Sequence, residues 1–398
     1  MLRPLKNIYH LFVAALAAFF YRFPAKKLKV IGVTGTDGKT TTAHLIYHLL
    51  KSAGKKVSMV STIGAAIGDK ECDTGFHVTT PDPREMQGYL RRAVNSGSEY
   101  MVLEVTSHAL DQNRVAFCNF LIGVLTNVSH EHLDYHRTYE NYAAAKMKLL
   151  KMAKVAVVNR DDESFKYVNG MWHMANGKLV TYGIRNKADF TPQKINFKIN
   201  LPGEFNKYNA LAAVVVALNL RISEEEICNA LLTFKLPEGR MEIVYKDSFS
   251  VIIDFAHTPN ALTQILSAVR ALQPKKLITV FGCAGERDFK KRPFMGEVAA
   301  KMADYTVLTA EDPRREDVNK IIDQITQGCL KVGAQERKDF FRIPDRQEAI
   351  NFAIRKLAQP GDLVVIAGKG HEKSMRVGNK EYPWSDREAV KKALEGRK

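Results

Sequence analysis

The chain has few cysteines, no cysteine pair at metal-binding spacing, and no repeated or low-complexity segment. Its five cysteines are scattered through 398 residues, and none belongs to a CxxC pair. This pattern is typical of reduced cytosolic thiols and argues against a disulfide framework or a structural zinc site. Helix-turn-helix, RNP and zinc-finger signatures are also missing, so no motif supports a nucleic-acid partner.

Positive charge, in contrast, is abundant. Lys and Arg number 59 against 43 Asp and Glu, for a formal net charge of +16. Such an excess favours anionic partners, among them nucleotides, polyanionic substrates, nucleic acid and acidic membrane surfaces. The basic residues are dispersed along the chain, which argues against nucleic acid, although a basic nucleic-acid-binding ATPase is retained as an alternative.

The apolar segment from Ile8 to Phe23 is short for a membrane span. As a helix it would reach about 24 Å, against ~30 Å of hydrocarbon. No A-x-A site follows it, which argues against a signal peptide. Two hypotheses stay open for residues 1–27: an interfacial helix on an anionic membrane, or a helix packed on the protein or a partner chain. We expect a cytoplasmic protein, in the first case at the inner face of the membrane. Basic residues flank the segment: Arg3, Lys6, Arg22, Lys26, Lys27 and Lys29.

Short apolar runs alternate with helical patterns along the rest of the chain. The runs predict strands in two series, at 28–33, 56–62, 100–106, 120–127 and 155–159, and at 250–257, 276–285, 305–313 and 362–370. Strands separated by helices favour a mainly parallel sheet covered on both faces. We therefore predict an α/β fold with a central domain at 28–236 and a Rossmann-like C-terminal domain at 237–398.

The stretch TGTDGKTTT, residues 34–42, resembles a phosphate-binding loop with unusual spacing. In the common pattern the first glycine would stand at Val33, but the glycines are Gly32 and Gly35. The context of strand, tight turn and helix is nevertheless that of a phosphate cradle. Lys39 offers a charge for phosphate and Thr40 a hydroxyl for Mg²⁺. We predict a variant P-loop ATPase domain.

Other polar residues follow predicted strands, where ligands bind in open α/β sheets. Glu104 ends one strand and is a candidate Mg²⁺ ligand. The segment 126–136 holds His130, His132 and His136, for which zinc is one reading, but the spacing is not HExxH. In the C-terminal half, GERDFKKRP, EDPRRED and GKGHE bring both signs of charge to one sheet edge. That combination suits a zwitterion such as an amino acid.

Taken together, these motifs resemble the Mur ligase family, and within it the UDP-N-acetylmuramoyl-tripeptide synthetase branch (MurE type). The shared motifs run in order from about residue 30 to 375: TGTDGKTTT, TTPD, EVTSHALDQNRV, TNVSHEHLDYH, YAAAK, GEFNKYNALAA, EGRME, DFAHTPNAL, FGCAGERDFKKRP, EDPR and GKGHE. The loop spacing is the spacing of this family. The resemblance implies an ATP- and Mg²⁺-dependent amide ligase that adds an amino acid to a muramoyl-peptide cell-wall precursor through an acyl phosphate.

The resemblance also implies roles for individual residues. Lys39, Glu104, His132 and Lys146 are the implied catalytic set, in which Thr40, Glu104 and His132 surround Mg²⁺ and Lys146, as a carbamate, binds a second Mg²⁺. ATP contacts are implied for Gly35, Thr36, Asp37, Gly38, Lys39, Thr40 and Thr41, for Asn206 and Asn209 by the adenine, for Arg240 at the phosphates and for Asp254 at the ribose. Acceptor contacts are implied for Thr79, Thr80, Thr106, Gln112 and Arg114. The implied amino-acid site comprises Arg287, Asp312, Arg314, Gly368 and Glu372.

The chain departs from the family pattern at two important points. Only about 27 residues precede the first ATPase strand, where the family has a separate uridine-nucleotide-binding domain. Acceptors that are lipid-linked, polyglutamate or folate therefore stay open. The usual Asp-Asn-Pro-Arg is Glu311-Asp312-Pro313-Arg314 here. Arg314 matches the form that binds the distal carboxylate of meso-diaminopimelate, so we predict that amino acid over lysine, with the added negative charge of Asp312 as the open question.

Overall fold

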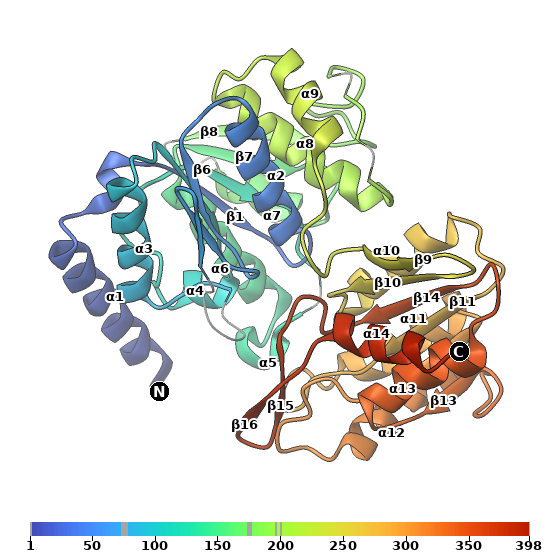
Figure 1. The fold of residues 1–398 in the computed structure, drawn as a ribbon. Helices are drawn as coiled ribbons and strands as arrows, with labels where there is room; N and C mark the ends of the chain where they lie inside the picture. Colours follow the sequence, from blue (N-terminus) through green and yellow to red (C-terminus); the bar gives the residue numbers. More distant parts are fainter. Residues whose placement is uncertain are drawn as a thin grey trace. The chain divides into compact units, whose positions relative to one another are not determined.

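The computed structural model describes residues 2–72, 79–129, 131–172, 177–195, 197–199 and 201–397. Contacts divide the chain into two compact units, Met1–Lys235 and Leu236–Lys398. Figure 1 shows both as helices arranged around a sheet, as expected for an α/β fold. The domain limits inferred from the sequence stay a prediction.

Unit 1 is built on an eight-stranded sheet with the order β4-β3-β2-β5-β1-β6-β7-β8. The strands from β2 to β8 in this order pair in parallel, whereas β3 and β4 add an antiparallel edge. The carboxyl ends of the parallel strands therefore lie at one edge of the sheet. The strands are β1 (Lys29–Thr34), β2 (Val57–Val60), β3 (Ala65–Ile67), β4 (Lys70–Cys72), β5 (Tyr100–Glu104), β6 (Phe120–Leu125), β7 (Val155–Asn159) and β8 (Lys178–Tyr182).

Helices cover both faces of this sheet. On β1, Ile31 and Val33 belong to the apolar cluster that includes residues of α2 and α8. Val30 belongs to the opposite cluster, with Met86 and Leu90 of α3. Successive residues of one strand are thus buried on opposite faces, which explains the continuous apolar runs. The helical segments are α1 (Leu2–Phe20), η1 (Pro24–Lys27), α2 (Lys39–Ser52), α3 (Pro83–Asn95), α4 (Ser107–Asp111), α5 (Leu133–His136), α6 (Tyr139–Met152), α7 (Phe165–Trp172), α8 (Glu204–Asn219) and α9 (Glu224–Thr233).

The N-terminal helix differs in extent from the apolar run. It spans Leu2–Phe20 and ends before Pro24, because Arg22 and Phe23 adopt left-handed conformations with φ of 57° and 47°. It packs along α3 in unit 1 (Figure 1). None of the described helices combines the length and apolarity needed to cross a bilayer.

Unit 2 contains a six-stranded sheet with the order β13-β12-β11-β14-β10-β9, parallel except for β9. Helices surround it, and a two-stranded hairpin extends from it (Figure 1). The strands are β9 (Glu242–Lys246), β10 (Ser250–Asp254), β11 (Leu277–Phe281), β12 (Tyr305–Leu308), β13 (Phe340–Arg342), β14 (Leu363–Ala367), β15 (Ser374–Val377) and β16 (Lys380–Pro383). The helical segments are α10 (Pro259–Arg270), α11 (Lys291–Met302), α12 (Val318–Lys331), α13 (Arg346–Phe352), η2 (Ala353–Leu357) and α14 (Asp386–Glu395).

A buried ion pair connects the strand ends of unit 2. Arg346 donates to both carboxylate oxygens of Asp386 at 2.8 Å, and both side chains are almost fully buried. The same guanidinium donates to the carbonyl oxygens of Ala310 and Ala367, at 3.1 and 3.0 Å. These two residues follow β12 and end β14, so Arg346 positions the loops that leave both strands.

We expect Arg346→Met to destabilise unit 2 strongly, because it leaves the Asp386 carboxylate buried and unpaired. Breaking such a pair costs about 3–5 kcal/mol. Urea unfolding followed by the fluorescence of Trp384, whose indole donates to Asp386, would measure it. Arg342→Gln breaks the more exposed pair with Asp323 and is the control, with a cost below about 1 kcal/mol. Equal losses for the two variants would contradict the assignment.

Candidate functional site

The loop between β1 and α2 has the geometry of a phosphate cradle. Gly38 precedes α2 with φ of 80°, in the left-handed region that favours glycine. Helix α2 begins at Lys39, so the backbone N–H groups of its first turn are available to an anion. A Cβ atom at position 38 would lie only 2.3 Å from Asn209 Oδ1. Position 38 therefore requires glycine both for backbone conformation and for space.

Two lysine side chains converge on one carbonyl oxygen of this loop. Lys39 Nζ donates to Gly35 O at 3.1 Å and to Thr36 O at 2.8 Å. Lys146 Nζ, from α6, donates to the same Gly35 oxygen at 2.5 Å. Burial lowers the pKa of Lys146 well below its ordinary value, and the Lys39 ammonium lowers it further. Both effects shift the equilibrium of the Lys146 side chain toward the neutral amine.

Thr40 and Glu104 provide oxygen atoms suited to Mg²⁺. Thr40 Oγ1 donates to Glu104 Oε1 at 3.0 Å, and Glu104, the last residue of β5, is only 1% exposed. Its other oxygen accepts the backbone N–H of Thr62 at 2.9 Å, which fixes the carboxylate. Hydroxyl and carboxylate oxygens are the ligands that Mg²⁺ prefers. The donor set at this end of the loop therefore fits a magnesium ion.

The loop is supported by residues that no sequence argument assigned. Thr126 Oγ1 donates to Asp37 O at 2.7 Å. The Asn127 side chain donates to Asp37 O at 3.0 Å and accepts Asp37 N–H at 2.9 Å. Tyr142 OH lies 3.1 Å from Thr36 Oγ1. The signal that was overlooked is a Thr-Asn pair placed directly after β6, the strand beside β1.

His132 lies close to this support. It precedes α5 in a left-handed conformation with φ of 56°, and its ring centroid is 4.9 Å from that of His108 and 6.0 Å from that of Tyr142. His130 lies outside the described residues. Within the described ranges, no group of three or more His, Cys, Asp or Glu side chains is arranged to hold a metal. The zinc reading of this segment gains no support, and the role of His132 beside Mg²⁺ stays a prediction.

Four of the five predicted acceptor residues form one hydrogen-bonded chain. Thr80 Oγ1 accepts Thr106 N–H at 3.0 Å and donates to Glu104 O at 3.1 Å. Arg114 Nη1 donates to Thr80 O at 3.3 Å, and Arg114 Nε donates to Gln112 Oε1 at 2.8 Å. The chain begins at the backbone of Glu104, whose carboxylate contacts the phosphate loop.

Thr79, the fifth, is connected to the same carboxylate through Thr62. The Thr62 hydroxyl donates to Thr79 Oγ1 at 3.1 Å, and the Thr62 backbone N–H donates to Glu104 Oε2. No motif marks Thr62. The structure thus brings the predicted acceptor positions and two of the predicted magnesium ligands, Thr40 and Glu104, into one network in unit 1.

Asn206 and Asn209 lie buried on α8, beside the phosphate loop. Asn209 Nδ2 donates to Asn206 Oδ1 at 3.2 Å, and Thr42 Oγ1 donates to Asn209 Oδ1 at 3.3 Å. Asn206 Nδ2 donates to Pro202 O at 2.7 Å. In this arrangement Asn209 braces the start of α2, and adenine contact for the two residues stays a prediction.

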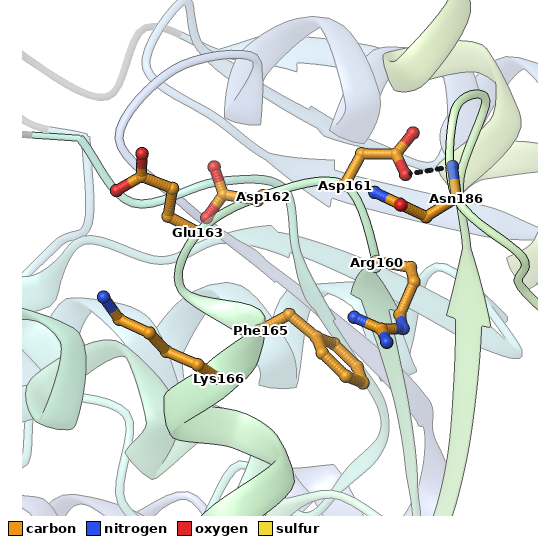
Figure 2. Close-up of a pocket in the computed structure, with 7 residues that line it drawn as sticks. All are labelled: Arg160, Asp161, Asp162, Glu163, Phe165, Lys166 and Asn186. Atoms are coloured by element: carbon orange, nitrogen blue, oxygen red, sulfur yellow. Dashed lines mark hydrogen bonds between the residues drawn. The ribbon is translucent and has the colours of Figure 1, made fainter.

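An open pocket of 410 Å³ lies where the chain leaves β7 (Figure 2). Asp161 accepts three backbone N–H bonds from residues 184–186, and Asp162 accepts one from Val128. Both carboxylates thus hold neighbouring loops, and we assign the pocket no ligand. None of the predicted site residues lines it; its lining consists of Arg160, Asp161, Asp162, Glu163, Phe165, Lys166 and Asn186.

In unit 2, the structure places Arg240 and Asp254 near one another. Both oxygens of Asp254, at the end of β10, accept backbone N–H bonds, from Met241 at 2.7 Å and Ala256 at 2.8 Å. The guanidinium of Arg240 lies 4.5 Å above the Phe255 ring. The contacts with phosphate and ribose implied for the two residues stay predictions.

Lys369 lies buried between two residues of the predicted amino-acid site. Its Nζ is 2.7 Å from Asp312 Oδ1 and 2.5 Å from Glu372 Oε2. Burial by itself would lower the pKa of Lys369, but the two carboxylates outweigh it and raise the pKa above the ordinary value. Lys369 is absent from the predicted site, although GKGHE contains it. The negative charge of Asp312 is therefore balanced inside unit 2.

The strand-end loops around this pair are tightly packed. Gly368 follows β14 with φ of 106°, and a Cβ atom there would lie 2.7 Å from Glu311 Oε2. Burial raises the pKa of Glu311 to about 7, although Lys291 opposes the shift. Glycine at position 368 thus leaves room for a buried carboxyl group beside the predicted amino-acid site.

Arg314 presents cationic surface with an unsatisfied donor. Its buried Nε atom makes no hydrogen bond to any described residue, and its backbone is left-handed with φ of 53°. Burial lowers the pKa of Arg314, and Arg287 and Arg376 lower it further. Arg314 and Arg287, both predicted site residues, therefore lie close enough to repel each other, which an anionic group between them would relieve.

Comparison with known families matches most of the chain to two models. The first, described as Mur ligase middle domain, matches residues 33–217. The second, described as Mur ligase, glutamate ligase domain, matches residues 239–370. The matched ranges contain every predicted site residue except Glu372.

Curated relatives include enzymes of one name. UDP-N-acetylmuramoyl-L-alanyl-D-glutamate–2,6-diaminopimelate ligase 1 of Clostridium acetobutylicum is 38% identical over 399 residues, covering 95% of this chain and 80% of the relative. The corresponding ligase of Caldanaerobacter subterraneus subsp. tengcongensis is 40% identical over 402 residues, covering 96% and 81%.

Solved structures show the same likeness. A structure of UDP-N-acetylmuramoyl-L-alanyl-D-glutamate–2,6-diaminopimelate ligase is 32% identical, with a TM-score of 0.61, and covers 93% of this chain and 79% of its own. A folylpolyglutamate synthase of Mycobacterium tuberculosis has a TM-score of 0.69 at 15% identity, covering 91% and 96%. The second likeness shows the fold alone.

We expect Gly38→Ala to weaken binding of a nucleoside triphosphate at least about tenfold, equivalent to about 1.4 kcal/mol. The new Cβ would push Asn209 away from Thr42, and the left-handed backbone adds strain. Gly97→Ala is a matched control, since Gly97 has φ of 78° with no atom within 4 Å of an added Cβ. Titration calorimetry with ATP measures the effect, and similar affinities for both variants would refute it.

Proposed function

The chain belongs to the Mur ligase family and is an ATP-dependent ligase; we propose that it adds meso-diaminopimelate to the D-Glu of a muramoyl dipeptide. Relatives at 38% and 40% identity bear the name of that reaction. The cationic cluster around Arg314 is the observation that carries the choice of amino acid. Likeness to a folylpolyglutamate synthase, at 15% identity, does not favour a folate or polyglutamate acceptor.

The proposed reaction has two steps. A carboxylate oxygen of the acceptor attacks the γ-phosphorus of ATP, which forms an acyl phosphate and releases ADP. The amine of the amino acid then attacks the acyl carbon, so that an amide bond forms, phosphate leaves and the amine loses a proton. In reactions of this kind a protein contributes mainly by positioning groups and neutralising charge.

Unit 1 supplies the groups for the first step. The first turn of α2 and Lys39 would bind the phosphates, while Thr40, Glu104 and His132 would hold Mg²⁺, an ion whose positive charge would offset that of the transferred phosphoryl group. The hydrogen-bonded chain from Glu104 through Thr80 and Thr106 to Arg114 and Gln112 orients the acceptor, with Thr79 beside it. The proposed ATP site of unit 1 is completed by Gly35, Thr36, Asp37, Gly38, Thr41, Asn206 and Asn209. For Arg240 and Asp254 of unit 2, contacts with phosphate and ribose stay predictions.

Lys146 is chemically suited to become a carbamate. A neutral amine attacks CO₂ to give an N-carboxylate and a proton, and the lowered pKa of Lys146 favours that neutral form. The carbamate keeps one N–H, which is enough to retain the bond to Gly35 O. The product carries a negative charge on oxygen, the ligand type that a second Mg²⁺ prefers.

The proposed amino-acid site contains arginines that could bind a carboxylate, and its buried aspartate is paired with a lysine. Arg314, with its unsatisfied Nε and with Arg287 nearby, offers the distal carboxylate of diaminopimelate a charge-assisted bond. Asp312, which replaces the usual asparagine of the family, is bound to Lys369 and does not present an uncompensated charge to that carboxylate. Gly368 and Glu372 complete the proposed site.

We expect the purified chain to release phosphate from ATP only with UDP-MurNAc-L-Ala-D-Glu and meso-diaminopimelate together. The assay crosses that acceptor with diaminopimelate, L-lysine and no amine. Arg314→Ala should lower the preference for diaminopimelate over lysine about 10- to 100-fold, because a charge-assisted hydrogen bond is worth about 1.5–3 kcal/mol. Arg315→Ala, next in the chain and bonded to Asn379, is the control. An unchanged preference in the first variant would refute the amino-acid assignment.

We expect Lys146→Ala to lose activity about a hundredfold or more, the range seen when one group that stabilises transition-state charge is removed. Formate or acetate should restore part of it, by supplying the missing carboxylate, and chloride should not. Lys151→Ala, at an exposed position of the same helix, should remain active. Activity should also decrease as the pH is lowered, because a carbamate is lost in acid. Full activity of protein freed of CO₂ would contradict the carbamate.

A further inference from the structure

Helix α1 exposes its large apolar side chains and buries its small ones. Six large apolar side chains are each more than half exposed: Ile8, Tyr9, Phe12, Leu16, Phe19 and Phe20. Ala14, Ala17 and Ala18, in contrast, are buried in unit 1. A surface helix normally turns its large apolar residues to the core, so the pattern of α1 is inverted.

The exposed residues form one continuous face. They recur at intervals of three or four along a helix of 19 residues, which is about 28 Å long. Contiguous apolar surface of this extent is uncommon on proteins that act alone and marks a site of contact with a partner or a membrane. In Figure 1, α1 lies on the outer side of α3, at the periphery of unit 1.

The charged residues of the N-terminal segment that carries this face are all cations. No Asp or Glu occurs in the sequence before Asp37, whereas Lys6, Arg22, Lys26 and Lys27 are all exposed. An apolar face whose own segment carries only cations matches the boundary between acyl chains and anionic headgroups.

Unit 1 holds α1 in place as a surface element. Asn113 Nδ2 donates to Asn7 O at 3.2 Å, and Arg91 Nε donates to Tyr21 O at 3.0 Å. Both ends of the helix are therefore tied to unit 1, and the large apolar side chains remain outside. Because it is held at both ends, α1 can present the whole length of its apolar face to a flat surface.

We propose that α1 docks on an anionic lipid bilayer, with its phenylalanines at the acyl boundary and its flanking lysines and arginines at the headgroup phosphates. A second copy of the chain is the less suitable occupant. Pairing through one shared patch would bring the same cations of both copies together, without an acidic residue of this segment to balance them.

Helix α1 is hydrogen-bonded to the segment that carries two of the proposed acceptor-binding residues. Asn113, which donates to Asn7 O of α1, follows α4 and lies between Gln112 and Arg114 in the sequence. The docked helix would thus hold the proposed acceptor network close to the lipid surface. Docking itself does not depend on the identity of the acceptor or the amino acid.

Co-sedimentation of the full chain with vesicles tests docking. Binding should be tight to vesicles of mixed phosphatidylglycerol and phosphatidylcholine, weak to phosphatidylcholine alone, and sensitive to salt. The double variant Phe12→Gln/Leu16→Gln should bind at least about tenfold more weakly. Leu232→Gln/Leu272→Gln changes two equally exposed apolar residues elsewhere (62% and 53%, as for Phe12 and Leu16) and should bind normally.

A second pair of variants tests the charge. Lys26→Gln/Lys27→Gln should weaken binding to the anionic vesicles, by about fivefold for each lysine that lies near the surface. Lys391→Gln/Lys392→Gln, exposed on α14, lowers the net charge equally and should have little effect. Phosphate release with the soluble acceptor and no lipid monitors the ligase separately in every variant.

Three results would overturn the proposal. The first is absence of binding to anionic vesicles. The second is an equal loss of vesicle binding in an α1 variant and its control. The third is dimerisation of a chain that does not bind vesicles, if the α1 variant abolishes that dimerisation. The last would assign the face to a second copy. Because ligase activity is measured without lipid, failure of docking and failure of the proposed reaction are distinguishable.

Discussion

The carbonyl oxygen of Gly35 accepts hydrogen bonds from two lysines, and the arrangement of the phosphate loop depends on this convergence. Two ammonium groups on one buried oxygen would repel each other. Lys146 is the more deeply buried, and its pKa is lowered by burial and then by Lys39. The loop thus sets two lysines in different environments: Lys39, which is partly exposed, and Lys146, whose burial shifts its pKa toward the neutral amine. Glu104, Asn127 and Tyr142 then hold the surrounding loop in this geometry.

In unit 2, the pKa of a buried lysine is shifted in the opposite direction. Lys369 is as buried as Lys146, but two carboxylates contact it and raise its pKa. Contact with carboxylates, rather than burial, decides the direction in which the pKa of each buried lysine is shifted. Asp312 is thereby paired inside the unit, with Lys369 donating to its carboxylate. In the proposed amino-acid site, this pairing would leave Arg314 more available to a substrate carboxylate.

Sequence reasoning reached the parallel α/β fold because buried strands between helices leave continuous apolar runs, and it reached Lys39, Thr40 and Glu104 because each occupies a strand end or a helix start. It missed Thr62, Thr126 and Lys369, whose importance comes from hydrogen bonds to residues distant in sequence. Arg346 was equally invisible, since only the folded unit places Asp386 and two strand-end carbonyls around its guanidinium. Local pattern predicts where a loop forms, whereas the side chains that brace it follow from which strands become neighbours.

Helix α1 shows where composition alone misleads. An apolar run flanked by lysines predicts a helix, but its period does not say which face turns inward, because alanine and phenylalanine are both apolar. Only the packing of α1 against α3 shows that the alanine face turns inward and the phenylalanine face outward. Small residues allow the close approach of two helices, and Gly88 of α3 extends this logic, since a Cβ atom there would lie 3.3 Å from the Tyr21 hydroxyl. Tight packing through small side chains leaves the large ones outside, so the same choice that seats α1 on unit 1 creates its exposed apolar face.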